Sequence, residues 1–180
     1  GMLLPISDNP EKDREIFLKI LTMDEEGLWQ RRSKSIPAKI IQSKLTEEEW
    51  CALNTDQNGN NKRLWSKGLN NEEKKVVLRK VFNRLSYNEK LTYCDRPEQI
   101  EGPSLEAWMD INGHLGTNVQ NLHELVEELG KRRFGSIPKI GDCFCGGGSI
   151  PFEAARLGCE AFGSDLNPVA AILTWASIHL

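Results

Sequence analysis

The stretch from residue 139 to residue 180 restricts the fold more than any other part of the sequence. A short strand-like segment from Lys139 to Cys143 runs into the glycines Gly146, Gly147 and Gly148. A helical segment, a second strand-like segment and another helical segment follow in turn. Because strand, glycine turn, helix, strand and helix in this order form a parallel β-α-β-α unit, we expect the opening half of a doubly wound, Rossmann-like α/β domain.

The boundaries inside this unit follow from turn and helix signals. The first helix is expected to begin near Ser149 and to end at Gly158, and the second strand to span Cys159 to Ser164. Asn167-Pro168 then starts the second helix, since proline favours the first turn of a helix. The sheet needs further strands, so we expect this chain to contain an incomplete domain. The expected division is therefore a helical region over 1–135 and the start of an α/β domain over 136–180.

Helix-capping signals and apolar spacing predict several helices before residue 136. We expect helices at the following places: from Pro10 after Asp8 or Asn9, from Glu47 after the capping box Thr46–Glu49, from Asn71-Glu72-Glu73 with an apolar stripe of Leu78, Val81, Phe82 and Leu85, after Ser104, and from Val119 to Leu129 with Gly130 at its end. The apolar stripes of these helices are expected to form core.

Composition excludes some classes of protein and leaves others open. The net charge of −3 provides no global electrostatic attraction to nucleic acid. Basic residues gather at 31–34, 62–63 and 131–133, and each group is expected to be a solvated surface patch. No apolar run approaches the roughly 20 residues of a membrane span, and the first residues lack the pattern of a signal peptide. We therefore expect no membrane association.

The cysteines indicate the redox environment. Their number, five, is odd and their spacing is irregular, which favours reduced thiols and a cytoplasmic protein over a disulfide framework. Cys143 and Cys145 stand two residues apart, but no second pair or histidine lies at a metal-binding spacing. We expect both to be small buried side chains, and we expect no metal site.

Two acidic residues indicate what the glycine turn would bind. Asp165 follows the second strand, where a carboxylate can accept hydrogen bonds from both hydroxyls of an adenosine ribose. Asp142 ends the first strand beside the turn, where it would repel a dinucleotide pyrophosphate. S-adenosylmethionine has an ammonium and a sulfonium in place of phosphate, so it suits that carboxylate. Pro151 also replaces the third glycine of a dinucleotide-binding turn.

The same residues resemble a known family. Asp142, Phe144, Gly146 and Gly148 are similar to the first motif of amino-group methyltransferases that act on nucleic acids. Over a narrower range, 146–154 and 164–170 resemble the adenine-specific DNA methylases that carry the DUF1156 domain, which are often associated with restriction or anti-phage systems. The resemblance is specific over about residues 142–171 and weaker in the helical region.

The resemblance implies a function for individual residues. It implies that the donor-binding residues are Asp142, Phe144, Gly146, Gly147 and Gly148 at the first turn and Asp165 at the ribose, with Leu166 and Asn167 flanking the adenine. The cofactor would be S-adenosyl-L-methionine. Cys143 departs from the family, which usually has proline there. DNA would be the partner of the full-length protein.

One expected element of such an enzyme is missing. Amino methyltransferases hold the target amine with an Asp- or Asn-Pro-Pro-aromatic sequence, and this chain has no such sequence. No residue is therefore assigned as catalytic, and we expect a donor-binding part of a DNA adenine-N6 methyltransferase that is inactive alone. Because a two-stranded sheet has unpaired edges and an uncovered face, self-association is also expected, or else the helical region covers that face.

Three alternatives remain open at this point. RNA guanine-N2 methyltransferases share the motif, with the cysteine that corresponds to Cys145, but no RNA-binding domain is recognisable in the helical region. A module without catalytic activity could keep donor binding or only an interaction surface. A dinucleotide-dependent oxidoreductase is disfavoured by Asp142 and by the absence of a third glycine.

Overall fold

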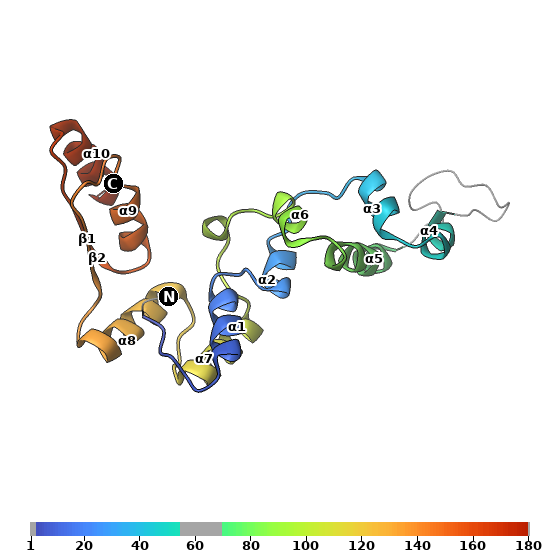
Figure 1. Ribbon diagram of the computed structural model, residues 1–180, viewed down its shortest axis with the longest axis horizontal. Helices are drawn as coiled ribbons and strands as arrows, with labels where there is room; N and C mark the ends of the chain where they lie inside the picture. Colours follow the sequence, from blue (N-terminus) through green and yellow to red (C-terminus); the bar gives the residue numbers. More distant parts are fainter. Residues whose placement is uncertain (1–2, 55–69, 180) are drawn as a thin grey trace. The chain divides into compact units, whose positions relative to one another are not determined.

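The computed structural model describes residues 3–54 and 70–179, which form an α/β structure with many helices and one sheet of two short parallel strands. Figure 1 shows the elements. In chain order they are α1 (Pro10–Ile20), α2 (Glu25–Gln30), α3 (Ala38–Lys44), α4 (Glu47–Asn54), α5 (Asn71–Asn83), α6 (Tyr87–Thr92), the 3-10 turn η1 (Pro97–Gln99), α7 (Leu105–Leu115), α8 (Leu122–Phe134), β1 (Lys139–Asp142), α9 (Ser149–Arg156), β2 (Glu160–Gly163) and α10 (Pro168–His179).

The chain divides into two compact units. The first unit joins Gly1–Ile20 to Gly102–Leu180, and the second is the continuous segment Leu21–Glu101 between them. The first unit thus contains α1, α7 and α8 together with the whole β-α-β-α segment. The change of composition near Ser136 lies inside this unit, and the domain boundary expected there stays a prediction.

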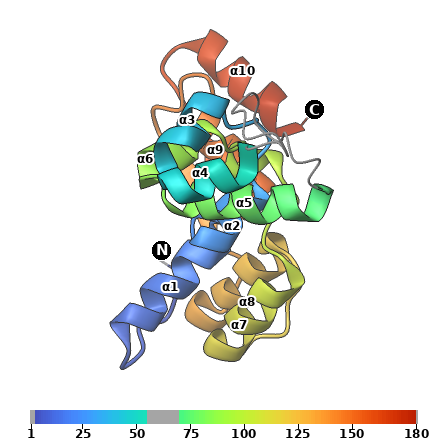
Figure 2. The same ribbon diagram turned by 90° about the vertical axis from the view of Figure 1, so that its right-hand side faces the viewer.

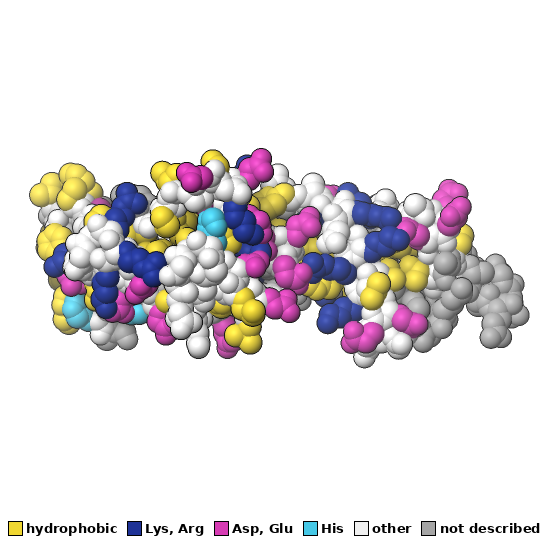
Figure 3. Space-filling model, turned by 90° about the horizontal axis from the view of Figure 1, so that it is seen from below, with side chains coloured by type: hydrophobic (Ala, Val, Ile, Leu, Met, Phe, Trp, Pro, Cys, Tyr) yellow, Lys and Arg dark blue, Asp and Glu magenta, His cyan; other side chains and the backbone are white. Residues whose placement is uncertain are grey.

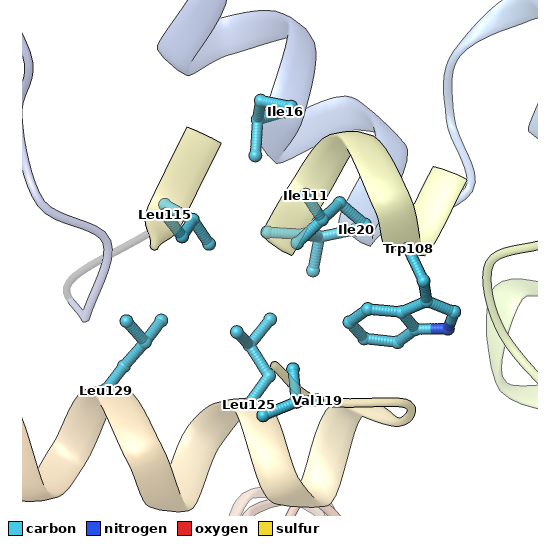
Figure 4. Packing of buried hydrophobic residues seen from close by; sticks show 8 residues of the cluster. All are labelled: Ile16, Ile20, Trp108, Ile111, Leu115, Val119, Leu125 and Leu129. Carbon is cyan, nitrogen blue, oxygen red and sulfur yellow. The ribbon is translucent and has the colours of Figure 1, made fainter. Parts of the chain in front are cut away.

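A hydrophobic cluster joins the three helices of the first unit that precede the sheet (Figure 4). Figure 2 shows α7 and α8 side by side, with α1 next to them. The buried side chains of this cluster are Ile16, Ile20, Trp108, Ile111, Leu115, Val119, Leu125 and Leu129. Burial of these apolar surfaces fixes how α1 packs against α7 although almost a hundred residues separate them in sequence.

The second unit has its own core. It consists of Leu28, Ile36, Ile41, Val81, Phe82, Leu85 and Cys94. Phe82 is fully buried and meets Trp29 edge to face, with 5.5 Å between ring centroids. The predicted stripe on α5 is therefore confirmed as core, whereas the short helices α2, α3 and α6 had no periodicity long enough to predict them.

Three predicted helix starts are confirmed by their caps. Asn9 Oδ1 accepts the amide N–H of Lys12 at 3.1 Å, so Asn9 caps α1. Thr46 and Glu49 form the reciprocal capping box, with distances of 3.2 Å and 3.0 Å between amide nitrogen and side-chain oxygen. Ser104 Oγ accepts the N–H of Ala107 and starts α7. Each cap provides an acceptor for an amide that has none within its helix.

The predicted end of α8 is wrong. The helix continues through Gly130 to Phe134 and ends at Gly135, whose φ of 74° is left-handed. Gly130 is needed for close packing instead, because an added Cβ would lie 2.4 Å from Cδ of Pro138. A glycine with a packing role inside a helix gives the same sequence signal as a terminal glycine.

The sheet is small, and its two faces differ. β1 and β2 pair in parallel, with Gly141 opposite Phe162 and Asp142 opposite Gly163. Both α9 and α10 lie on one side of the strands (Figure 1), where Gly163 faces side chains of both helices. Phe162 points to the other face and is 68% exposed. The sequence order and strand pairing expected for the β-α-β-α unit are thus confirmed, with one face covered by helices.

Candidate functional site

The loops that follow the two strands are joined through their backbones. The N–H of Ser164 donates to the carbonyl oxygen of Asp142 at 2.9 Å, which continues the strand pairing by one more bond. The N–H of Cys145 then donates to the carbonyl oxygen of Ser164 at 3.1 Å. The glycine turn and the loop after β2 therefore form one backbone structure at the carboxyl end of the sheet.

Asp165 joins the same two loops with its side chain. Its Oδ2 accepts the N–H of Gly146 at 2.9 Å, and its Oδ1 accepts the N–H of Asn167 at 2.8 Å. These bonds from the amides of Asn167 and Gly146 lower the pKa of Asp165, because they stabilise the ionised form. Asp165 is thus part of the scaffold of the turn. Each carboxylate oxygen keeps a second lone pair that a further donor can use.

Asp142 has a freer carboxylate. Its Oδ1 accepts the N–H of Phe144 at 3.1 Å, a local bond that folds the chain back at the end of β1. Among the described residues, no hydrogen bond or ion pair to its Oδ2 is found. Asp142 and Asp165 therefore lie at the same edge of the sheet, as the sequence predicted, and both accept backbone N–H groups of the loops that follow the strands.

The three consecutive glycines have different backbone requirements. Gly146 has a φ of 52° and Gly148 a φ of 81°, both left-handed, whereas Gly147 does not have a positive φ. A Cβ added at Gly147 would meet no atom within 4 Å. The fold therefore requires glycine at 146 and 148. Nothing in the described structure requires it at Gly147, which is exposed.

Gly148 also meets α10 directly. A Cβ at this position would lie 2.8 Å from both Cα and Oγ1 of Thr174. Gly163, at the end of β2, is equally close to the Thr174 methyl group, at 2.7 Å. The two glycines thus let α10 approach both the turn and the sheet.

The residues expected to flank an adenine have unequal roles. Leu166 is 92% exposed and Phe144 is 75% exposed, so both present apolar side chains to solvent beside the turn. Asn167 instead caps α10, since its Oδ1 accepts the N–H of Val169 at 3.0 Å. This cap confirms the helix start expected at Asn167-Pro168 and gives the Asn167 side chain a structural role.

The cysteines of the turn do not share one environment. Cys145 is 5% exposed, as predicted, but Cys143 is exposed, so the prediction that both are buried is wrong. Cys143 follows the last residue of β1, where the chain leaves the sheet and neither helix covers it. Within residues 3–54 and 70–179, no three His, Cys, Asp or Glu side chains are grouped to hold a metal ion.

One basic side chain of the group at 31–34 is buried in the fold and not exposed at the surface. Arg31 is 4% exposed, and its guanidinium donates to the carbonyl oxygens of Asp95 and Thr22. The prediction of a solvated patch is therefore wrong for this residue. It holds for Lys131, Arg132 and Arg133, which are exposed, while residues 62–63 lie outside the described part of the chain.

Thr174 contributes to the site although its sequence position did not predict this. It is 2% exposed and lies on α10, and its hydroxyl is within hydrogen-bonding distance of Cys145 Sγ at 3.1 Å. A lone threonine within the apolar run from Val169 to Trp175 was the available signal, because a hydroxyl buried in a helix needs an acceptor.

No family model, characterised protein or solved structure matches the chain. Its own geometry thus defines the site: a glycine turn between two carboxylates at the carboxyl end of parallel strands. Ligands of open parallel sheets bind in this place. None of the described helices has the length and apolar character needed to cross a membrane.

Proposed function

We propose that the chain is the donor-binding part of an S-adenosylmethionine-dependent methyltransferase that acts on the N6 amino group of adenine in DNA. In this proposal β1 and β2 are the first strands of a larger Rossmann-like sheet. The donor would lie over Gly147, between the carboxylates of Asp142 and Asp165. Leu166 and Asn167 would flank the adenine ring, and Phe144 would belong to the donor-binding turn.

The observation that carries the proposal is the position of Asp142. Its carboxylate ends β1 directly before the glycine turn, and its Oδ2 is not used by the described residues. A negative charge there disfavours a pyrophosphate and favours the ammonium and sulfonium groups of S-adenosylmethionine. Asp165 supports the same proposal, because each of its carboxylate oxygens accepts one backbone N–H and keeps a lone pair for a ribose hydroxyl.

Pro151 argues against a dinucleotide. A dinucleotide-binding turn uses a third glycine for close packing between its helix and the sheet. Here the position is proline, which is buried within the first turn of α9. A proline also provides no N–H to a phosphate at the helix N-terminus.

The acceptor in the proposal comes from the resemblance of residues 142–171 to adenine-specific DNA methylases. The 180 residues contain no Asp- or Asn-Pro-Pro-aromatic sequence that would hold the target amine. We therefore expect this chain to bind the donor without transferring its methyl group. RNA guanine-N2 methyltransferases remain the alternative in the same class, since Cys145 also matches their motif.

Isothermal titration calorimetry of the chain with S-adenosylmethionine, S-adenosylhomocysteine and NAD tests the donor. The informative variant is Gly147→Ala, because the fold accepts a Cβ there whereas a ligand over the turn would meet it. We expect the wild type to bind the two methyl-donor compounds and not NAD, and Gly147→Ala to bind at least about tenfold more weakly with unchanged circular dichroism.

Two results would contradict the proposal. One is binding of NAD with no response to either methyl-donor compound. The other is unchanged donor affinity in Gly147→Ala, which would place the ligand away from the turn. Exposed Lys75→Ala on α5 in the other unit provides the control for unspecific effects on the titration.

A further inference from the structure

Thr174 is a buried polar residue on a helix that otherwise exposes large apolar side chains. It is 2% exposed, while its neighbours Leu173 and Trp175 are 54% and 62% exposed. A hydroxyl removed from water must regain hydrogen bonds inside the protein. The partners of Thr174 therefore show what this side of α10 is built to hold.

The hydroxyl group reaches the glycine turn. Thr174 Oγ1 lies 3.1 Å from Cys145 Sγ and 3.4 Å from the carbonyl oxygen of Gly146, which are 29 and 28 residues away in sequence. Its single hydrogen can serve one of these acceptors at a time. Both acceptors belong to the first residues of the turn, so the hydroxyl ties α10 to the point where the chain leaves β1.

The contact between the Thr174 hydroxyl and the Gly146 carbonyl oxygen bears on where the next amide points. The carbonyl of Gly146 and the N–H of Gly147 belong to one planar trans peptide and point in opposite directions. When Thr174 holds the carbonyl oxygen on the α10 side, the Gly147 N–H is turned away from α10. Among the described residues, no acceptor for this N–H is found, and a Cβ at Gly147 would meet only open space.

The methyl side of Thr174 has a different partner. Cγ2 would lie 2.7 Å from a Cβ added at Gly163, and Cα would lie 2.8 Å from one added at Gly148. Thus the hydroxyl contacts both the start and the end of the turn, and the methyl group packs against the end of β2. Substitutions that remove only the hydroxyl or only the methyl group separate these contacts.

We propose that Thr174 is a positioning residue for the donor site: its hydroxyl holds the Gly146 carbonyl so that the Gly147 N–H faces the bound donor. This assignment rests on the proposed donor site, and it adds a residue of α10 to that site. Loss of the hydroxyl frees the peptide between Gly146 and Gly147 to rotate.

Three substitutions in the full chain separate the parts. Thr174→Val removes the hydroxyl and keeps the shape, and Thr174→Ser keeps the hydroxyl and removes the methyl group. Ser177→Ala is the matched control, because it removes a hydroxyl from the same helix whose bond, among the described residues, goes to the carbonyl oxygen of Thr174.

The first readout does not depend on any ligand. Cys145 is buried and Cys143 is exposed, so native-state alkylation by iodoacetamide, followed by peptide mass spectrometry, gives a ratio of the two rates. Thr174→Val should raise the relative rate at Cys145 about fivefold, as expected for loss of one hydrogen bond. Thr174→Ser and Ser177→Ala should stay within about twofold of the wild type.

The second readout is the affinity for S-adenosylhomocysteine by calorimetry. Thr174→Val should bind about fivefold to tenfold more weakly, and Thr174→Ser should restore wild-type affinity. A raised Cys145 rate with unchanged affinity would overturn the positioning role. An unchanged Cys145 rate would overturn the tie itself.

The two proposals fail in different ways. If the wild type binds no methyl-donor compound, the proposed function is wrong and so is the positioning role, while the Cys145 rates still decide whether Thr174 holds the turn. If Thr174→Val does not fold, the serine variant carries the test, and a serine variant with a Cys145 rate raised fivefold would overturn the assignment.

Discussion

Gly147 and Gly148 are adjacent, yet an added methyl group would have opposite consequences at the two positions. At Gly148 the backbone has a φ of 81° and the space is filled by Thr174. At Gly147 the backbone suits any residue and the space is empty. The fold therefore requires glycine at position 148, whereas a requirement for glycine at position 147 would come from a ligand.

Gly148→Ala should therefore destabilise the protein and Gly147→Ala should not. We expect a loss of at least about 2 kcal/mol in the free energy of unfolding for Gly148→Ala, from the left-handed backbone and the contact with α10. Gly147→Ala should stay within about 0.5 kcal/mol of the wild type. Urea unfolding followed by circular dichroism measures both, and equal losses would show that the turn has another conformation.

Asp165 should make stability depend on pH in the acid range. Its pKa is lowered in the folded state, so its contribution is fully present above the unfolded pKa of about 3.9 and is lost as the pH falls through the folded pKa. Asp165→Asn should lower the urea midpoint at pH 7, because the amide cannot accept both N–H groups.

The difference between Asp165→Asn and the wild type should then shrink below about pH 4. Midpoints measured from pH 3 to pH 7 provide the test, with exposed Asp8→Asn as the control that keeps the wild-type profile. A difference that stays constant over this range would mean that the Asp165 carboxylate does not bond to the two amides.

For single residues, the sequence predicts where a side chain lies in the fold better than it predicts the hydrogen bonds of that side chain. The spacing of Asp142 and Asp165 after two strands predicts that both lie at one edge of the sheet, and they do. The bonds from Asp165 to Gly146 and from Thr174 to Cys145 could not be predicted, because they join residues whose distance is set by the packing of α10 and the curve of the turn.

Among the elements, α10 has an unusual distribution of side chains. It buries small or polar residues, Ala170 and Thr174, and exposes large apolar ones. The exposed residues of α10 are Val169, Ile172, Leu173 and Trp175, with exposed fractions between 54% and 66%. Figure 3 shows hydrophobic side chains at the surface at the end of the view that contains α10. A helix that is apolar on all sides is normally covered.

We expect this face to cause the self-association predicted from the sequence. Ile172→Lys places a charge in the middle of the exposed residues and should weaken self-association at least about tenfold, since burying an unpaired charge is costly. Sedimentation velocity over a range of concentrations measures the effect. Val76→Lys, at a residue of α5 that is 68% exposed, is the matched control.

The stability of Ile172→Lys should remain within about 0.5 kcal/mol of the wild type, because the residue is exposed. Self-association that is equally weakened by Val76→Lys, or unaffected by both variants, would contradict a role for α10.

The buried and exposed sides of helix α7 provide a further test of the core of the first unit. Ile111 is completely buried between α1 and α8, whereas Met109 on the same helix is 75% exposed. Ile111→Ala should reduce the free energy of unfolding by roughly 2–5 kcal/mol, and Met109→Ala should change it by no more than about 0.5 kcal/mol. Thermal and urea unfolding measure both, and a small loss for Ile111→Ala would show that this core is not formed.

Elements were predictable where a cap and a periodic stripe agreed, as in α1 and α7. They were not predictable where one signal has two causes. Gly130 is the instructive case, because a glycine that packs against Pro138 looks the same in the sequence as a glycine that ends a helix.

At the scale of the whole molecule, the first unit is discontinuous in sequence. Residues from α1 share a core with α7 and α8, and the second unit is the segment between them. The ion pair of Lys19 with Asp110 also joins the two parts of the first unit. Composition alone could not predict this, because apolar stripes do not specify which distant stripe they pack against.

The proposed function depends on one site at the carboxyl end of the sheet. Hydrogen–deuterium exchange of the chain with and without saturating S-adenosylmethionine tests this site directly. We predict slower exchange at the amides of residues 144–149 and 164–167, with little change in α5. Absence of any change, or protection confined to the second unit, would contradict a donor site between Asp142 and Asp165.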